Sequence, residues 1–450
     1  MQSLDDKRLG QGLRRALARG RDRTIREVIS AGLRDRDYEN LATGIRMEAH
    51  AQPVGNEKRI VCDCVDVERG VNINRCLLSN SAASPIVEGA LIAAFATGAS
   101  SVTIHIAEDG DRGCEALESS ASHLKIDRVR LEVVRGPFRR DMKGYEERPT
   151  LILTGETLLN LSRILTRGAE EYRMTGTPDS PGTKLFQVSG AVNRPGIFEL
   201  PLGTGLRDLI EEVCGGVRAG DNLQAVIVGG AKGACFRPDE LDLSLDFDTV
   251  RSSGGVIGSG AVDVLTQADC IIDQARQRIA SSCYDECGMC SLGREGSYQL
   301  REMITDATRA KSKGNDLAML REIGGAMQQG CACVSGRTAP NLILSTMEKF
   351  PEEYEAHMRR KRCQALVCER YVTFHILPDL CDGCCACADG CPGDAIEGEK
   401  KKIHVIDQES CEKCGKCYEV CNALRQAVVK AGAVKPRTPK RPIPVGTWNA

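Results

Sequence analysis

Two runs of four cysteines near the carboxyl end constrain this sequence more than any other feature. In each run the successive cysteines are separated by two, two and three residues, and Pro392 follows the first run. This spacing holds a pair of 4Fe–4S clusters, and the fourth cysteine of each run ligates the cluster of the other run. We therefore expect one cluster on Cys381, Cys384, Cys387 and Cys421, and a second on Cys411, Cys414, Cys417 and Cys391.

Zinc ribbons also use pairs of cysteines two residues apart, but two complete four-cysteine runs fit iron–sulfur better. The segment resembles the bacterial two-cluster ferredoxins. The chain has 23 cysteines in 450 residues, and its first 32 residues contain no apolar core typical of a signal peptide. We therefore expect a cytoplasmic protein, in a reducing compartment that keeps thiols available for metal.

The composition argues against two classes of partner. The formal net charge is only −2 and aromatic residues make up 4% of the chain, so neither charge nor stacking surfaces favour nucleic acid. No apolar stretch of membrane-spanning length occurs. We expect no nucleic-acid partner and no membrane span.

The N-terminal part predicts an α/β layer. Apolar residues at helical spacing predict one amphipathic helix over residues 3–31. Residues 60–64 read as a short buried strand, a helix of small apolar residues starts at Pro85, and residues 101–106 return as a strand. Strand, helix and strand in this order are typical of α/β folds.

Beyond Arg148 the sequence matches a known pattern closely. The matching segments are Asp179–Phe186, Ser189–Gly190, Asn193–Gly196 and Gly258–Gly260. Through them the chain resembles the NADH-binding flavoprotein subunit of respiratory NADH dehydrogenase and the beta subunit of electron-bifurcating hydrogenases.

The resemblance implies an α/β protein with several domains. An N-terminal helix and a degenerate, Rossmann-like FMN/NADH-binding domain would occupy residues 1–175, and a β-grasp domain of the SLBB type residues 176–262. A helical bundle with a 4Fe–4S site would follow at 263–360 and a two-cluster ferredoxin domain at 361–430. The basic, proline-rich tail at 431–450 is expected to extend onto a partner subunit, with simple disorder as the alternative.

The glycine-rich loop that binds FMN and NADH in this family is degenerate here. The family pattern is Gly-Leu-Arg-Gly-Arg-Gly-Gly-Ala-Gly-Phe-Pro-Thr-Gly, whose glycines let backbone N–H groups approach phosphate. This chain keeps Gly32, Arg34 and Gly44 but has Asp35 and Asp37 at glycine positions. Carboxylates that face a phosphate repel it, so we expect no FMN in this loop.

Two further departures point the same way. Residues 63–70 replace most of the polar segment that the family places beside the flavin, and only residues 137–147 remain of a much longer nucleotide segment. We expect the domain to persist as a scaffold with no catalytic residue of its own.

Cysteines in the bundle predict a third 4Fe–4S cluster. The resemblance implies the ligands Cys283, Cys287, Cys290 and Cys331, with Cys333 as a replacement for a missing ligand. The spacing departs from the family run, and an empty or zinc-filled site is the alternative.

A second metal is predicted between the bundle and the ferredoxin domain. His357, Cys363 and Cys368 would be three ligands of a structural zinc, with the fourth from Cys333 or Cys385; two reduced thiols in a hinge are the alternative. Seven other cysteines show no ligand run, and most are expected to be small buried hydrophobic residues: Cys62, Cys64, Cys76, Cys114, Cys214, Cys235 and Cys270.

Two hypotheses of function follow. In the first, the chain is an electron-transfer subunit of a cytoplasmic redox complex of the hydrogenase, dehydrogenase or reductase type, passing electrons between clusters and on to a partner or to soluble ferredoxin. In the second, it is an active FMN-dependent NAD(P)H-oxidising subunit with an unusual pocket.

Overall fold

The computed structural model describes residues 10–53, 57–66, 68, 70–108, 112–124, 126–136, 149–284 and 290–448. The chain forms two compact units. The first comprises Met1–Thr266, Gln277–Leu300 and Arg321–Lys349, and the second comprises Gln267–Arg276, Arg301–Leu320 and Phe350–Ala450.

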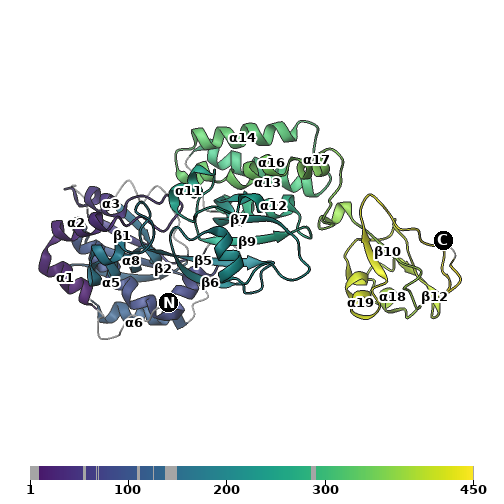
Figure 1. Cartoon of the computed structure of the whole chain (residues 1–450), viewed down its shortest axis with the longest axis horizontal. Coiled ribbons are helices and arrows are strands. Elements are labelled where there is room, and N and C mark those ends of the chain that lie inside the picture. Colours follow the sequence, from purple (N-terminus) through teal and green to yellow (C-terminus); the bar gives the residue numbers. More distant parts are fainter. Residues whose placement is uncertain are drawn as a thin grey trace. The chain divides into compact units, whose positions relative to one another are not determined.

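A four-stranded parallel sheet organises the N-terminal part of the first unit (Figure 1). Its strand order is β3-β2-β1-β4, with Cys62 of β1 facing Ile104 on one side and Leu153 on the other. β1 and β2 are short apolar runs buried at most positions, as expected for strands covered on both faces. The bounds are β1 Arg59–Asp63, β2 Ser101–Ile106, β3 Arg130–Arg135 and β4 Thr150–Thr154.

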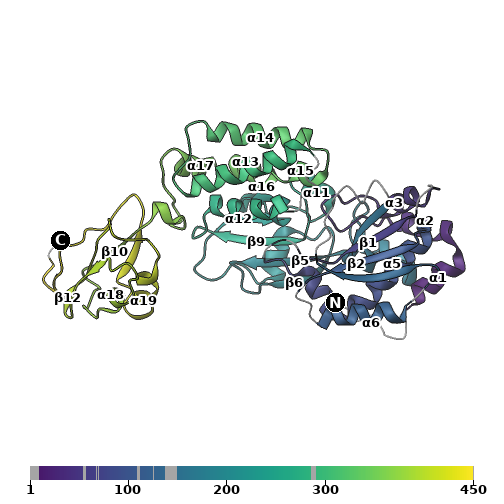
Figure 2. The same cartoon turned by 180° about the vertical axis from the view of Figure 1, so that it is seen from behind.

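Helices pack on this sheet and on one another (Figure 2). α5 (Ala83–Thr97) is apolar on nearly every face and is buried accordingly. It approaches α8 (Gly155–Arg167) so closely that a Cβ at Gly89 would lie 2.1 Å from the Leu158 carbonyl oxygen. The other helices of this part are α3 Thr43–Ala51, α4 Ile73–Leu77, α6 Arg112–His123 and α9 Ala169–Arg173.

The N-terminal segment differs from the single helix that the sequence predicts. It forms α1 (Gln11–Arg19) and α2 (Arg21–Ala31), and residues 1–9 lie outside the described part. Gly20 separates the two helices with φ 82° and ψ 167°, a conformation that only glycine adopts readily. Helical spacing continues through Gly20, which is why the pattern alone did not reveal the break.

A five-stranded mixed sheet of order β6-β5-β9-β7-β8 forms the other half of the first unit. β5 and β9 are parallel and the remaining pairs are antiparallel. α16 (Asn341–Lys349) packs on β8, and the Ser345 hydroxyl accepts a hydrogen bond from the Cys235 backbone N–H at 3.1 Å. The strands are β5 Thr183–Gly190, β6 Gly196–Pro201, β7 Leu223–Val228, β8 Ala234–Phe236 and β9 Ala261–Thr266.

Helices follow the second sheet in sequence. Their bounds are α12 Ile271–Tyr284, α13 Ser291–Thr308, α14 Asp316–Gly330, α15 Val334–Thr338 and α17 Pro351–Met358.

The cysteine-rich end of the second unit is built from short antiparallel strand pairs and two helices. β10 (Thr373–Ile376) pairs with β14 (Val428–Ala431), and β11 (Ile396–Glu397) pairs with β13 (Val405–Ile406). The helices α18 (Ala386–Asp389) and α19 (Lys416–Leu424) each follow a cysteine loop.

The C-terminal tail folds back onto this part of the chain. β15 (Ile443–Pro444) pairs with β12 (Lys402–Ile403), and Trp448 packs against the hydrophobic core of the cysteine-rich part. The expectation of an arm on a partner subunit stays a prediction, and the strand pair at residues 443–444 anchors the described tail to this part of the chain. The pairing arises because β12 offers a free edge to the tail.

Candidate functional site

The eight cysteines of the two runs line two separate cavities in the second unit. Cys381, Cys384, Cys387 and Cys421 line a cavity with an empty volume of about 330 Å³. The second cavity, of about 340 Å³, is lined by Cys391, Cys411, Cys414 and Cys417. Each cavity thus receives three cysteines from one run and the fourth from the other run.

The two cysteine loops share one backbone conformation. Gly383 and Cys385 have φ of 72° and 70°, and Lys413 and Gly415, at the equivalent positions of the second run, have φ of 60° and 80°. These left-handed residues turn each loop around its cavity before the following helix begins. A non-glycine residue at such a position is uncommon, so its repetition marks a conformation that the loop requires.

Burial and neighbouring thiols raise the pKa values of two of these cysteines. Burial, and then the neighbouring Cys381 and Cys421, raise the pKa of Cys387 to about 12. Burial, and then Cys411, raise the pKa of Cys417 to about 11. A cationic metal centre would offset both effects, since coordination deprotonates a thiol outright. The donor set of each cavity therefore fits a metal cluster.

The second unit also contains a separate group of four buried side chains. Cys270, His357, Cys363 and Cys368 place their ligand atoms within 4.8 Å of one another. Cys270 Sγ lies 3.2 Å from His357 Nε2 and 3.7 Å from Cys368 Sγ. His357 Nδ1 donates to the Glu353 carbonyl oxygen at 2.9 Å, which turns Nε2 toward the sulfurs.

This group corrects the sequence prediction in one ligand. The fourth member is Cys270, and neither Cys333 nor Cys385 belongs to the group. Hydrogen bonds from Cys270 and Cys368 hold the pKa of Cys363 far below its ordinary value, which favours a thiolate. Three sulfurs and one imidazole nitrogen are the ligand set of many structural zinc sites.

The bundle cysteines are only partly brought together. Hydrogen bonds from the Ala332 and Gly293 backbone, and one from the Cys331 thiol, lower the pKa of Cys290. Cys331 and Cys333 both lie beside Gly336, where a Cβ would be 3.0 Å and 3.6 Å from their sulfurs.

Cys283 lies at the end of α12, with its sulfur 3.6 Å from the Ser297 carbonyl oxygen. Cys287, the remaining predicted ligand, lies outside the described residues, as do residues 137–147 of the shortened segment.

In the degenerate loop, a side chain accepts hydrogen bonds from backbone N–H groups of the loop itself. The Asp37 carboxylate accepts hydrogen bonds from the backbone N–H groups of Glu39 and Asn40, both at 2.9 Å. Asp35 does not face the cavity as expected from the sequence: it is fully buried and accepts from Thr43 and Arg46. The prediction that both carboxylates face a phosphate is therefore wrong for Asp35, because the positive charge of Arg46 on α3 draws it inward.

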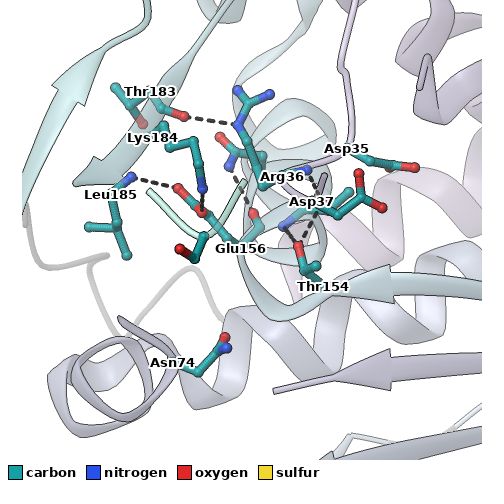
Figure 3. A network of polar contacts seen from close by, with 12 residues as sticks. Asp35, Arg36, Asp37, Asn74, Thr154, Glu156, Thr183, Lys184 and Leu185 are labelled. Carbon is teal, nitrogen blue, oxygen red and sulfur yellow. Dashed lines mark hydrogen bonds and ion pairs between the residues drawn. The ribbon is translucent and has the colours of Figure 1, made fainter. Parts of the chain in front are cut away.

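Two arginines of the loop bind groups in other parts of the first unit. Arg36 donates to the Thr183 carbonyl oxygen at 3.0 Å (Figure 3). It also donates to the Tyr172 hydroxyl at 2.9 Å. Arg34 pairs with Asp248 at 2.7 Å. Gly32 has φ 67°, and a Cβ at Gly44 would lie 2.7 Å from the Ile29 side chain.

A cavity with an empty volume of about 830 Å³ lies beside this loop. Its cationic lining residues are Arg36 and Lys184, and both are engaged by protein groups. The Tyr38 ring lies so close to Gly258 that a Cβ there would be 2.3 Å from it. The acidic lining residues are Asp37, Asp63, Asp66, Glu68 and Glu156.

Comparisons with known proteins match two segments of the chain to family models and most of it to known relatives. Residues 273–357 match the NADH-ubiquinone oxidoreductase-F iron-sulfur binding region, and residues 185–233 match the SLBB domain. The NADP-reducing hydrogenase subunit HndC of Solidesulfovibrio fructosivorans is 30% identical over 88% of this chain and 88% of its own length. The F subunit of the NADH-quinone oxidoreductase of Aquifex aeolicus is 29% identical over 78% of this chain and 89% of its own.

A solved structure has the same fold over most of the chain. The crystal structure of NAD+-reducing [NiFe]-hydrogenase in the H2-reduced state superimposes with a TM-score of 0.68 and 24% identity, covering 78% of this chain. This chain spans 65% of the length of that chain. The described part of our chain contains no helix with both the length and the apolar character needed to cross a bilayer.

Proposed function

The chain belongs to the family of the NADH-quinone oxidoreductase F subunits and the hydrogenase subunit HndC, and we propose that it is an electron-transfer subunit without a flavin of its own. It is an iron–sulfur subunit of an oxidoreductase. In this proposal it relays electrons between redox centres of partner subunits.

The pair of four-cysteine cavities carries the proposal. Each cavity offers four sulfurs from two loops of the same conformation, which supports the assignment of residues 361–430 to a two-cluster ferredoxin domain. A bound 4Fe–4S cluster takes up and releases electrons. The residues around it hold it in place and tune it, as the Ala395 N–H does at 3.4 Å from Cys391 Sγ. No general acid, base or nucleophile is required.

A third cluster in the bundle would add another redox centre to the two of the ferredoxin domain. The proximity of Cys290 to Cys331, and the family match over residues 273–357, support a cluster on Cys283, Cys287, Cys290 and Cys331. Cys333 lies beside Cys331 and is the replacement for a ligand that fails to bind.

The degenerate loop supports the loss of flavin from the domain at residues 1–175. The N–H groups of Glu39 and Asn40, which a glycine-rich loop would offer to a phosphate, are occupied by Asp37. The acidic cavity lining adds repulsion for any phosphate placed there.

We further propose a structural zinc on Cys270, His357, Cys363 and Cys368. The full burial of this set and the proton on His357 Nδ1 support a closed, tetrahedral site. Its role is to fix the segment that precedes the ferredoxin domain.

Partner subunits would belong to a hydrogenase, dehydrogenase or reductase complex, and soluble ferredoxin is a further candidate. The names of the relatives, a hydrogenase subunit and quinone oxidoreductase subunits, support this class of assembly.

The alternative is a retained FMN-dependent NAD(P)H oxidation, which the large cavity beside the loop favours. Anaerobically purified protein separates the two through its acid-released flavin and its iron content. We expect no flavin and about twelve iron per chain with three 4Fe–4S clusters, or about eight without the bundle cluster. One FMN per chain would overturn the proposal in favour of the alternative.

A further inference from the structure

A histidine lies in the wall of one ferredoxin cavity and has no counterpart in the other. His404, between β12 and β13, lines the cavity of Cys381, Cys384, Cys387 and Cys421. It is 1% exposed, and its Nδ1 lies 4.0 Å from Cys381 Sγ. Its Nε2 has no hydrogen-bond partner among the described residues. The Nδ1 edge of this buried ring is the one that faces the cavity of four sulfurs.

The surrounding packing holds the ring in this position. A Cβ at Gly398 would lie 2.3 Å from the His404 ring, so the backbone presses directly on the imidazole. The ring turns its Nδ1 toward the Cys381 sulfur. With the proton on Nδ1, the ring donates toward the Cys381 sulfur.

The second cavity has no side-chain donor of this kind among the described residues, although the Ala395 backbone N–H lies 3.4 Å from Cys391 Sγ. Its lining contains no histidine, lysine or arginine among the described residues, and its one charged lining residue is Glu412. The first cavity, by contrast, is lined by His404 and by Arg425, whose guanidinium pairs with Asp382 at 2.5 Å. Hydrogen bonds to cluster sulfurs and local charge are two of the factors by which a protein sets the potential of a bound cluster.

We propose that His404 is a positioning residue that donates a hydrogen bond to Cys381 and makes the cluster on Cys381, Cys384, Cys387 and Cys421 the higher-potential member of the pair. The inference rests on the proposed function. Reduction adds one electron and no proton to the cluster, so its sulfurs become more negative and the hydrogen bond strengthens. The donor therefore stabilises the reduced form. Electrons that enter the pair come to rest at this cluster.

The test is a reductive titration of the full chain with dithionite, followed by electron paramagnetic resonance. His404→Leu removes the donor, whereas His404→Gln keeps a side-chain N–H. We expect His404→Leu to lower the higher of the two ferredoxin potentials, so that the ratio of reduced to oxidised cluster at fixed potential falls about tenfold, or about 59 mV for one electron. The other potential should stay unchanged, and His404→Gln should recover most of the shift.

A matched control is His375→Leu. His375 is also buried in this module but bonds to the Thr373 hydroxyl at 2.9 Å and lines neither cavity. Unchanged potentials in a His404→Leu protein with full iron would overturn the inference while leaving the proposed function intact. Absence of both cluster signals from the unmodified chain would instead overturn the proposed function. If His404→Leu loses iron, the apolar variant His404→Phe replaces it: a higher ferredoxin potential that falls relative to His375→Leu supports the inference, and an unchanged potential refutes it.

Discussion

Lys184 on β5 donates from its ammonium group to the Glu156 carboxylate on α8 at 2.8 Å, and both side chains are buried (Figure 3). The other carboxylate oxygen of Glu156 accepts the Leu185 backbone N–H at 2.7 Å. One buried carboxylate therefore joins the parallel sheet region, through α8, to the mixed sheet.

Removing one partner of this pair should be costly. Glu156→Ala leaves the Lys184 charge buried without its partner, and we expect a loss of about 3–5 kcal/mol in the free energy of unfolding. The double variant Glu156→Leu, Lys184→Met should lose clearly less, because no charge is left buried. Urea unfolding followed by circular dichroism measures both. Arg207→Ala, which removes a solvent-exposed pair with Asp242, is the control and should leave the stability close to that of the parent. A double variant as unstable as the single one would contradict the prediction.

Glu68 should make stability depend on pH. Burial raises the pKa of Glu68 from 4.5 to about 6, so the folded protein favours the protonated carboxyl. The stability that the protonated Glu68 carboxyl contributes to the folded state is fully present below pH 4.5 and is lost as the pH rises through 6. Glu68→Gln keeps a neutral group at all pH values. We expect the variant to be more stable than the parent by about 2 kcal/mol at pH 7 and equally stable at pH 4. A difference that is the same at both pH values would rule this out.

The zinc assignment predicts a selective loss of metal. Cys270→Ser should abolish bound zinc and leave iron unchanged, as measured by elemental analysis of the purified chain. Cys235→Ser is the matched control, since Cys235 is equally buried but belongs to no group of metal-ligating side chains in the described residues. Zinc retained in Cys270→Ser, or never present in the parent, would refute the site.

The ferredoxin assignment predicts which loop cysteines hold iron. Cys417→Ala should lose about four iron per chain, corresponding to one cluster, and should destabilise the module. Cys385→Gly is the control, because Cys385 belongs to neither predicted set of cluster ligands and glycine suits its φ of 70°. We expect full iron in this control. A Cys417→Ala protein with undiminished iron would contradict the ligand set.

The sequence was most informative where ligands are local. The cysteine spacing predicts which four sulfurs share a cavity, because each loop and its following helix are set by neighbouring residues. It could not reveal Cys270, which is separated from His357 by 87 residues and from Cys368 by 98 residues. Only tertiary packing brings such segments together. A lone cysteine at the start of a helix carries no local signal of metal binding.

For the degenerate loop, the sequence shows the acidic residues but does not predict the direction in which Asp35 points. Acidic residues at glycine positions are visible in the sequence, whereas the direction of Asp35 depends on Arg46 in the following helix. The break at Gly20 and the return of the tail as β15 depend likewise on contacts that periodicity does not encode.

Asp37 gives this loop an anion that is covalently part of the chain. A loop that needs a nucleotide to neutralise its N–H groups can finish folding only when that nucleotide is supplied. Here the Asp37 side chain does this itself, so under the proposed function this loop needs no nucleotide supplied from outside in order to fold.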